Sequence, residues 1–412
     1  MITRDVAVGR AVELAKSNSY LILNWATGVG KSKAAISIAQ DVNPSKILLI
    51  VAETAHKKNW EIEFEKWGKE LWERTSVECY ASLKNYKDTE WDLIILDEGH
   101  HAKSELRADV LSTIKAEQVV VLTATLSVAD ELILSTAFNH GFHRYTITLQ
   151  DAIMEGILPT PKIYLLPLEL DKESQSVTIE ESWGDSKKRV NNNVPFERRF
   201  QFLNKKVWPA SNLTIRCTPF QKYNYLTEKV EYFKRQFMLR RQEFLKNKWL
   251  QLGSARKRLL AELKTEVLRQ LLNRFNEKRY ICFCGSIEQA DLLGGDCAIH
   301  SKKPNSLKTI EAFNKKEINQ LIAVNMLQEG QNLIDIELGI IAQLDGQERA
   351  FIQKFGRTLR AEDPVQVILY FRGTRDEEYL EKALEGINPE YVHVVDALSE
   401  IEVIIKEPSK RN

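Results

Sequence analysis

The sequence predicts an α/β protein with two doubly wound parallel-sheet lobes and a basic, largely helical insertion between them. Its 412 residues exceed what a single hydrophobic core usually holds. Helix-like and strand-like runs alternate in two separate stretches, and the segment between those stretches differs in composition. We place the first lobe at residues 1–168, the insertion at 169–262 and the second lobe at 263–412.

In the first lobe, amphipathic runs alternate with short apolar runs. We expect helices near residues 4–17, from residue 31, at 59–71 and at 105–116. The strands between them are LILNW, KILLIVA, DLIILDE and QVVVLTAT. A parallel sheet of this kind binds ligands at the carboxyl ends of its strands, and each motif below directly follows a strand.

The insertion is distinguished by its charge. The whole chain has a net charge of only +1, but residues 198–279 hold 21 lysines and arginines against six glutamates and no aspartate. A helical run over 219–252 has one apolar stripe surrounded by these cations. Its members are Leu226, Val230, Phe233, Phe237, Phe244 and Trp249. A local positive charge of this size favours a polyanionic partner.

The second lobe repeats the pattern of the first. We expect a helix over 264–275, the strand YICFCGS, a helix from Ile287, and the strands QLIAVNM, LGIIAQL and VQVILYF. Cys282 and Cys284 alternate within one strand and no CxxC spacing occurs, so the cysteines are expected to be reduced core thiols rather than zinc ligands. No apolar run is long enough to cross a membrane, which predicts a cytoplasmic protein.

A phosphate-binding loop is predicted at residues 25–32, WATGVGKS, between a strand and a helix. The glycines allow backbone N–H groups to surround a phosphate at the helix N-terminus, a lysine adds a positive charge, and a serine can ligate Mg²⁺. Trp25 stands where the usual pattern begins with glycine. The residues predicted to bind ATP are Thr27, Gly28, Val29, Gly30, Lys31 and Ser32.

Two adjacent carboxylates end the strand DLIILDE. Asp97 is predicted to hold Mg²⁺ through water together with Ser32, and Glu98 to orient and deprotonate the attacking water. Lys31, Asp97 and Glu98 are therefore the predicted catalytic residues of the first lobe.

With His100, the strand end reads D-E-x-H, and the chain resembles the DExH-box motors of helicase superfamily 2, which have two RecA-like lobes. Further motifs follow in that family's order: TAT at 123–125, GQNL from 330 and QKFGRTLR from 353. The resemblance implies that Gln353, Arg357 and Arg360 complete the ATPase site from the second lobe. It also implies that coupling or nucleic-acid contact involves His100, Thr123, Thr125, Thr54, Ser286, Gly330 and Asn332.

Within the superfamily, the run NWEIEFEKW at 59–67 and the lysine of DEGHHAK resemble Swi/Snf-type translocases. The segments QKFGRTLR and DAIMEGIL are closer to XPB-like and restriction-enzyme motors. The N-terminus lacks an adenine-reading glutamine, so Arg4 or Arg10 could serve that purpose, and Asn325 replaces the usual Thr or Ser. The compact size suggests a phage-type motor, which would act in the host cytoplasm.

These observations predict an ATP- and Mg²⁺-dependent DNA helicase or translocase that contacts phosphates rather than base edges. DNA is favoured over RNA, a monomer is favoured, and replication or repair proteins are candidate partners. Three alternatives stay open: a Swi/Snf-like duplex translocase that does not separate strands, a nucleotide-gated nucleic-acid clamp, and a P-loop kinase or small-molecule ATPase.

Overall fold

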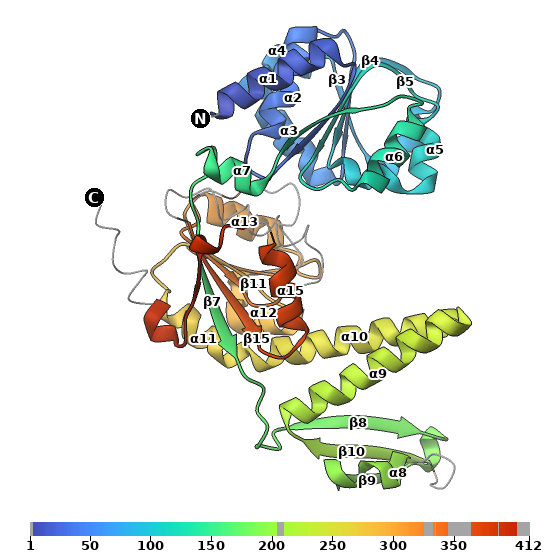
Figure 1. Cartoon of the computed structure of the whole chain (residues 1–412), viewed down its shortest axis with the longest axis vertical. Coiled ribbons are helices and arrows are strands. Elements are labelled where there is room, and N and C mark those ends of the chain that lie inside the picture. The colour runs from blue at the N-terminus through green and yellow to red at the C-terminus, as the bar shows by residue number, and fades with distance from the viewer. Residues whose placement is uncertain are drawn as a thin grey trace.

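The computed structural model describes residues 3–203, 210–324, 333, 335–344, 364–385 and 387–401. Two lobes follow one another along the long axis, and a helical hairpin with a small sheet extends from the second lobe (Figure 1). Both large sheets are entirely parallel, with helices on their faces. The predicted fold class, two doubly wound parallel-sheet lobes, is confirmed.

The first lobe is built on six parallel strands in the order β3-β2-β4-β5-β1-β6. Its strands are β1 (Tyr20–Trp25), β2 (Ile47–Val51), β3 (Thr75–Cys79), β4 (Glu90–Asp97), β5 (Lys115–Thr123) and β6 (His143–Ile147). Its helices are α1 (Arg4–Ser17), α2 (Lys31–Val42), α3 (Thr54–Trp67), α4 (Lys69–Trp72), α5 (Glu105–Leu111) and α6 (Val128–Ala137). All five side chains of β2, ILLIV, are buried, because helices cover both faces of the sheet.

The second sheet has seven strands in the order β12-β13-β11-β14-β15-β7-β16. They are β7 (Lys162–Leu168), β11 (Tyr280–Phe283), β12 (Ala298–Ile299), β13 (Gln320–Ala323), β14 (Leu338–Ile341), β15 (Val365–Phe371) and β16 (Val392–Val394). Its described helices are α11 (Thr265–Arg274), α12 (Ile287–Gly294), α13 (Ser306–Asn314) and α15 (Arg375–Leu384). Strand β7 pairs with β15 from Lys162 to Leu168, so the second sheet includes residues 162–168, which the boundary expected at residue 168 assigns to the first lobe.

The insertion contains a sheet that the sequence did not predict. Strands β8 (Val177–Trp183), β9 (Val190–Pro195) and β10 (Ser211–Cys217) form it, with β10 in the centre and the short α8 (Arg199–Leu203) nearby. Its inner face packs Ile179, Leu213 and Ile215 against Tyr225. The insertion, expected to be largely helical, therefore contains a small sheet as well as helices.

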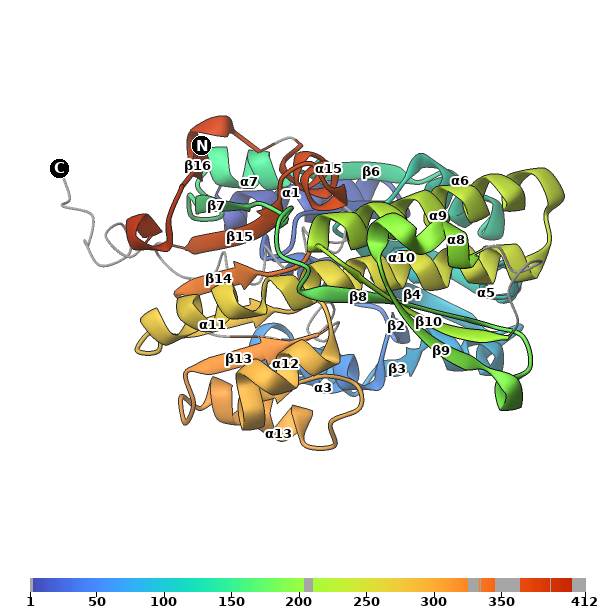
Figure 2. The same cartoon turned by 90° about the horizontal axis from the view of Figure 1, so that it is seen from below.

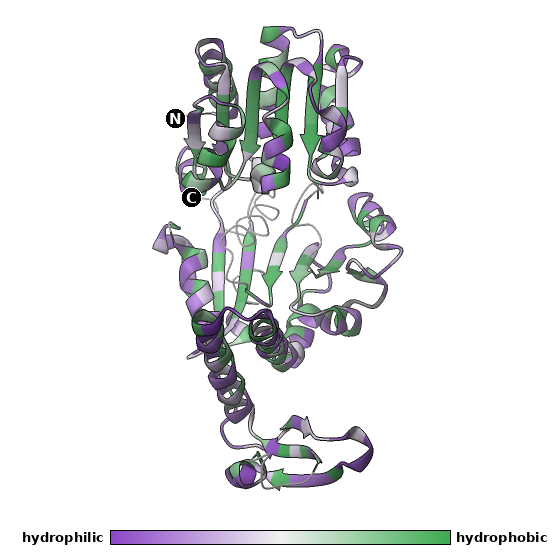
Figure 3. Cartoon of the chain, turned by 90° about the vertical axis from the view of Figure 1, so that its right-hand side faces the viewer, coloured by the Kyte–Doolittle hydropathy of each residue, from purple (hydrophilic) through white to green (hydrophobic). Residues whose placement is uncertain are grey.

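The expected single helical run is a hairpin of two antiparallel helices, α9 (Pro219–Arg240) and α10 (Glu243–Leu263). The chain reverses at Arg241, whose φ of 52° lies in the left-handed region that ends helices. The two helices run side by side away from the second lobe (Figure 2), and Phe237 packs on Trp249 with ring centroids 6.1 Å apart. Apolar colours concentrate in the two large sheets, whereas the hairpin is mostly hydrophilic (Figure 3).

The two lobes are joined through α7 (Leu149–Met154) and the segment that leads into β7. The largest buried cluster includes residues of both sheets as well as Ile157 and Leu158 of this connection. A long ion pair, 4.0 Å from Lys58 Nζ of α3 to Glu311 Oε1 of α13, also bridges the lobes. None of the described helices has the length and apolarity to cross a bilayer.

Candidate nucleotide site and nucleic-acid contacts

The predicted motifs of the first lobe meet at one edge of its sheet. Strands β1, β5 and β4 are direct neighbours, with Asn24 opposite Thr123 and Asp97 opposite Leu122. The P-loop follows β1, the acidic pair ends β4, and the TAT turn follows β5. Parallel neighbours end at a common edge, so the three motifs come together there, on the side of the sheet that faces the second lobe (Figure 3).

The P-loop has the backbone that phosphate binding needs. Gly28 and Gly30 have φ values of 92° and 113°, which side-chain-bearing residues rarely adopt. A Cβ on Gly28 would lie 3.2 Å from Leu158 Cδ2, and one on Gly30 would lie 3.3 Å from Arg4 Cδ. Helix α2 begins at Lys31 with no side-chain cap, which leaves its first N–H groups available to an anion.

The contacts of Trp25 explain why tryptophan can stand where the usual loop pattern has glycine. Its side chain is fully buried and packs edge-on against Tyr145, with ring centroids 5.4 Å apart. Its carbonyl oxygen accepts a hydrogen bond of 2.9 Å from Lys31 Nζ. The first position of the loop therefore supplies core packing and a backbone acceptor that holds the lysine beside the loop.

Asp97 is held by two aromatic donors. The Trp60 indole N–H donates to Asp97 Oδ2 at 2.8 Å, and the Tyr80 hydroxyl donates to the Asp97 carbonyl oxygen at 3.0 Å. Burial, reinforced by the neighbouring Glu98 charge, raises the pKa of Asp97. A cation beside this carboxylate would offset both effects, and Mg²⁺ prefers such oxygen ligands.

Glu98 sits in a strained backbone conformation, with a φ of 49° that is uncommon for a residue with a side chain. Its Oε2 lies 3.4 Å from His100 Nδ1, and the His100 side chain is buried. Strain of this kind is typical of functional sites.

The residues of this edge fit ATP with Mg²⁺. The glycine cradle and the uncapped N-terminus of α2 suit phosphates, and Asp97 with Ser32 in the first turn of α2 provides oxygen ligands. Val29 is fully buried and Thr27 is half-buried. Arg4 also contacts the loop, because its Nη2 donates to the Gly28 carbonyl oxygen at 3.2 Å.

Arg4 and Arg10, the candidates for adenine selection, lie in different surroundings. Arg4 Nη2 also lies 3.5 Å from the Ile157 carbonyl oxygen, so this side chain touches both the P-loop and the connection to the second lobe. The Arg10 guanidinium stacks over the Tyr145 ring at 5.3 Å. Of the two, only Arg4 has a described contact with the P-loop.

The predicted coupling residues of the first lobe are placed as follows. Thr123 is fully buried, and its hydroxyl oxygen accepts from the Thr125 amide at 3.2 Å, which closes the TAT turn. Thr54 opens α3 at an exposed position, where its Oγ1 lies 3.8 Å from Cys79 Sγ. The exposed position leaves Thr54 accessible to a strand of nucleic acid.

The predicted residues of the second lobe are mostly not placed. Ser286 is buried and caps α12, because its hydroxyl oxygen accepts from the Gln289 amide at 3.1 Å. The remaining predicted residues lie outside the described part of the chain: Gly330, Asn332, Gln353, Arg357 and Arg360. Their roles stay predictions from the motifs.

Sequence reasoning missed two residues beside Asp97, Trp60 and His56. Both lie on one face of α3, one helical turn apart, and both are buried. Neither His56 ring nitrogen has a hydrogen-bond partner within the described residues. The run NWEIEFEKW contained the available signal for Trp60, but only tertiary structure shows that its indole reaches Asp97.

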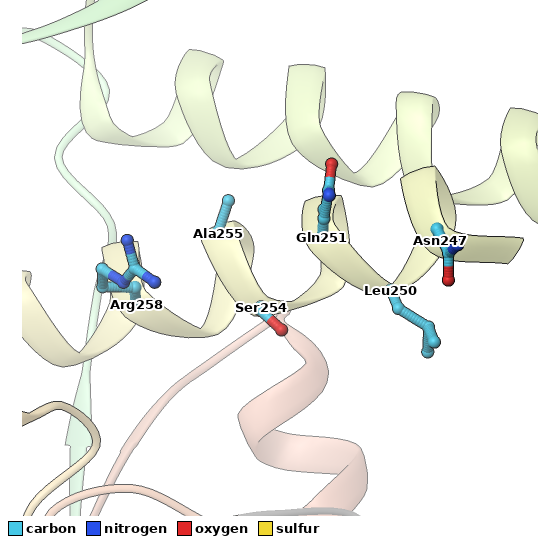
Figure 4. A pocket seen from close by; sticks show the side chains of 6 residues that line it. All are labelled: Asn247, Leu250, Gln251, Ser254, Ala255 and Arg258. Carbon is cyan, nitrogen blue, oxygen red and sulfur yellow. The ribbon is translucent and has the colours of Figure 1, made fainter. Parts of the chain in front are cut away.

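The hairpin presents a shallow groove of about 530 Å³ on one face of α10 (Figure 4). Its lining residues recur at spacings of three and four and are mostly polar: Asn247, Leu250, Gln251, Ser254, Ala255 and Arg258. A second cavity of about 310 Å³ lies between α9, α10 and α15. Both cavities lie away from the nucleotide edge, so they are candidates for contact with a polymer rather than with ATP.

Comparisons with known proteins agree with this architecture. Residues 263–362 match the helicase conserved C-terminal domain family. The crystal structure of the Pyrococcus furiosus Hef helicase domain is similar over 93% of this chain and 98% of that one, with a TM-score of 0.51 at 15% identity. No curated protein shows a significant sequence match to the chain. Residues 263–362, in the second lobe, are therefore similar to a helicase conserved C-terminal domain, and the chain shares the two-lobe fold of the Hef helicase domain.

Proposed function

We propose that this protein is a motor that hydrolyses ATP with Mg²⁺ and moves along the phosphate backbone of DNA. The observation that carries the proposal is the position of the P-loop and the Asp97–Glu98 pair at the same edge of the first sheet, where only β5 lies between their strands, β1 and β4. The matched helicase domain in the second lobe supports it.

In this proposal each residue has a separate task. Lys31 and the P-loop N–H groups hold the phosphates, and Asp97 with Ser32 holds the metal through water. Mg²⁺, when bound, would neutralise part of the negative charge of the phosphates. Glu98 orients the attacking water and accepts its proton. Arg357 and Arg360 of the second lobe complete the charge cluster when the lobes close, so hydrolysis depends on lobe movement.

A comparison of polymers tests the proposal. Phosphate release is measured without nucleic acid and with single-stranded DNA, duplex DNA and RNA, and we expect DNA to raise the rate at least about tenfold, within the range that assembly of a complete site can supply. DNA binding without hydrolysis would favour the nucleotide-gated clamp. An ATPase rate that is the same with and without nucleic acid would favour a P-loop kinase or small-molecule ATPase and would refute the motor.

A strand-displacement assay distinguishes the two motor types. Release of a labelled strand from a partial duplex indicates a helicase. ATP-dependent displacement of a bound protein without strand release indicates the Swi/Snf-like duplex translocase. Repeating the assay with the single-stranded flank on one end of the duplex and then on the other gives the direction of movement.

The hairpin is expected to hold the polymer through phosphates. Lys248 and Arg258 are exposed on α10, and Arg258 lines its groove. Replacing both with alanine should reduce the slope of log affinity against log salt by about 0.7–0.9 for each phosphate that the protein no longer neutralises. We also expect affinity to fall by a similar factor for all DNA sequences. Fluorescence anisotropy over a salt series measures both quantities.

Lys87→Ala is the matched control. Lys87 is exposed in the turn before β4, at the opposite edge of the sheet from the motifs. Its removal should leave the salt slope unchanged. Equal effects of the α10 variant and the Lys87 variant would show that the hairpin has no specific role in binding.

A further inference from the structure

Helix α3 connects three places that the proposed function needs to coordinate. Its first residue, Thr54, is exposed at the predicted nucleic-acid loop. Lys58, one turn later, points to Glu311 of the second lobe at 4.0 Å. Trp60, on another face of the same helix, donates to Asp97 Oδ2 at 2.8 Å. A rigid helix of 14 residues therefore touches the metal-binding carboxylate, the second lobe and an accessible loop.

The Trp60 ring is fixed by its own packing. The side chain is only 3% exposed, and its ring centroid lies 5.9 Å from that of Phe64, which packs against Trp72 at 5.4 Å. A ring held on several sides has little freedom to turn its N–H away. Movement of α3 would therefore carry the indole donor with it.

The hydrogen bond has a direct consequence for Asp97. The bond from the indole N–H to Oδ2 restricts the rotation of the carboxylate. The Tyr80 bond to the Asp97 carbonyl oxygen anchors the backbone of the same residue. Partners of this kind orient metal ligands, and their removal typically weakens metal affinity or activity by about 10- to 100-fold.

We infer that Trp60 is a positioning residue that orients the Asp97 carboxylate toward Mg²⁺, and that α3 makes this orientation depend on contact with nucleic acid and the second lobe. The inference rests on the proposed function, since Mg²⁺ at Asp97 is part of it. It adds a structural path from the Thr54 loop to the metal site.

The test compares Trp60→Phe with Trp67→Phe. Trp67 lies on the same helix and its indole N–H also donates to a carboxylate, Glu63 Oε2 at 3.2 Å, but that half-buried pair lies within α3 itself and does not involve Asp97. Both variants lose an indole N–H and keep an aromatic ring. Affinity for a fluorescent ATP analogue is measured with Mg²⁺ and with EDTA, and ATPase rates are measured with and without DNA.

We expect Trp60→Phe to weaken Mg²⁺-dependent nucleotide binding about 10- to 100-fold while affinity in EDTA stays within about twofold. The ratio of DNA-stimulated to basal ATPase rate should fall as well. Trp67→Phe should match the wild type in every measurement. Trp60→His, which restores a ring N–H, should recover part of the affinity.

Equal Mg²⁺ dependence in the Trp60→Phe protein and the wild type would overturn the inference. Should wild-type protein bind Mg²⁺ and nucleotide without hydrolysing ATP, the binding comparison still decides the role of Trp60, and only the proposed function fails. Should Trp60→Phe not fold, the indole ¹H–¹⁵N spectrum of the wild type is used. One slowly exchanging signal, retained in Trp67→Phe, should shift when Mg²⁺ joins the nucleotide complex, and a spectrum without that shift would contradict the inference.

Discussion

Lys31→Ala and Glu98→Gln are each expected to abolish DNA-stimulated ATP hydrolysis, but by different routes. Lys31 opens α2 beside the glycine cradle, so its replacement removes the positive charge that holds the phosphates, and nucleotide affinity should fall at least about tenfold. Glu98→Gln keeps the size of the side chain and removes the base. We expect it to retain nucleotide binding and to lose about 10²- to 10⁴-fold in turnover.

Nucleotide binding and phosphate release, measured on the same preparations, separate the two routes. Lys33→Ala is the control, because Lys33 lies two residues further along α2 and pairs with the exposed Asp5 at 2.7 Å. It should behave as the wild type. Hydrolysis that survives in Glu98→Gln at the wild-type rate would remove Glu98 from the proposed mechanism.

Of the substitutions proposed above and below, Lys264→Met is expected to lower the free energy of unfolding most. Lys264 is fully buried between α10 and α11, and its Nζ lies 2.5 Å from Asp376 Oδ2 of α15. It also donates to the carbonyl oxygens of Ala342 and Leu369 at 2.8 and 3.1 Å. Burial lowers the pKa of Lys264, and the Asp376 charge opposes that shift. Methionine would leave the Asp376 carboxylate buried without its cation, at a cost of about 3–5 kcal/mol.

Denaturant unfolding of the second lobe measures this decrease. The double variant Lys264→Met/Asp376→Leu should recover a large part of it, because both buried charges are then gone. The exposed pair Lys278–Glu337, 3.0 Å apart in the same lobe, provides the control. Lys278→Met should change stability by less than about 1 kcal/mol, and an equal effect of the two single variants would show that the buried pair has no special importance.

Local chemistry made part of this structure predictable. Gly28 and Gly30 are required by the left-handed backbone of the loop itself, so the P-loop and the start of α2 at Lys31 could be predicted from neighbouring residues. The apolar strands β2 and β4 were equally clear, since both faces of the sheet are covered. The expected helix at residues 4–17 matches α1.

Elements that depend on distant partners were not predictable in the same way. Strand β7 follows the first lobe in sequence but pairs with β15, about 200 residues later, and no local pattern records that choice. Strand β10 (SNLTIRC) alternates apolar and polar residues, but its partners β8 (VTIEESW) and β9 (VNNNVP) contain polar runs that concealed the sheet. The end of α9 at Arg241 depends on a residue that rarely adopts positive φ.

The candidate site also contains some residues that could be predicted from the sequence and others that could not. Asp97 and Glu98 follow from the strand that they end. The indole donor of Trp60 and the buried pair of Lys264 with Asp376 bring together residues 37 and 112 positions apart, and only folding reveals such contacts. A sequence pattern identifies reactive residues within one helix or strand. The residues that hold them in place belong to neighbouring elements.

The central claim is that one nucleotide site is completed by both lobes, with Lys31 and Glu98 from the first and an arginine pair from the second. The most direct test measures ATP affinity and single-turnover hydrolysis in Arg357→Ala and Arg360→Ala. We expect ATP affinity to stay within about tenfold of the wild type while hydrolysis falls about 10³-fold or more, because the transition-state charge is no longer neutralised by an arginine. Hydrolysis at the wild-type rate in both variants would contradict the claim.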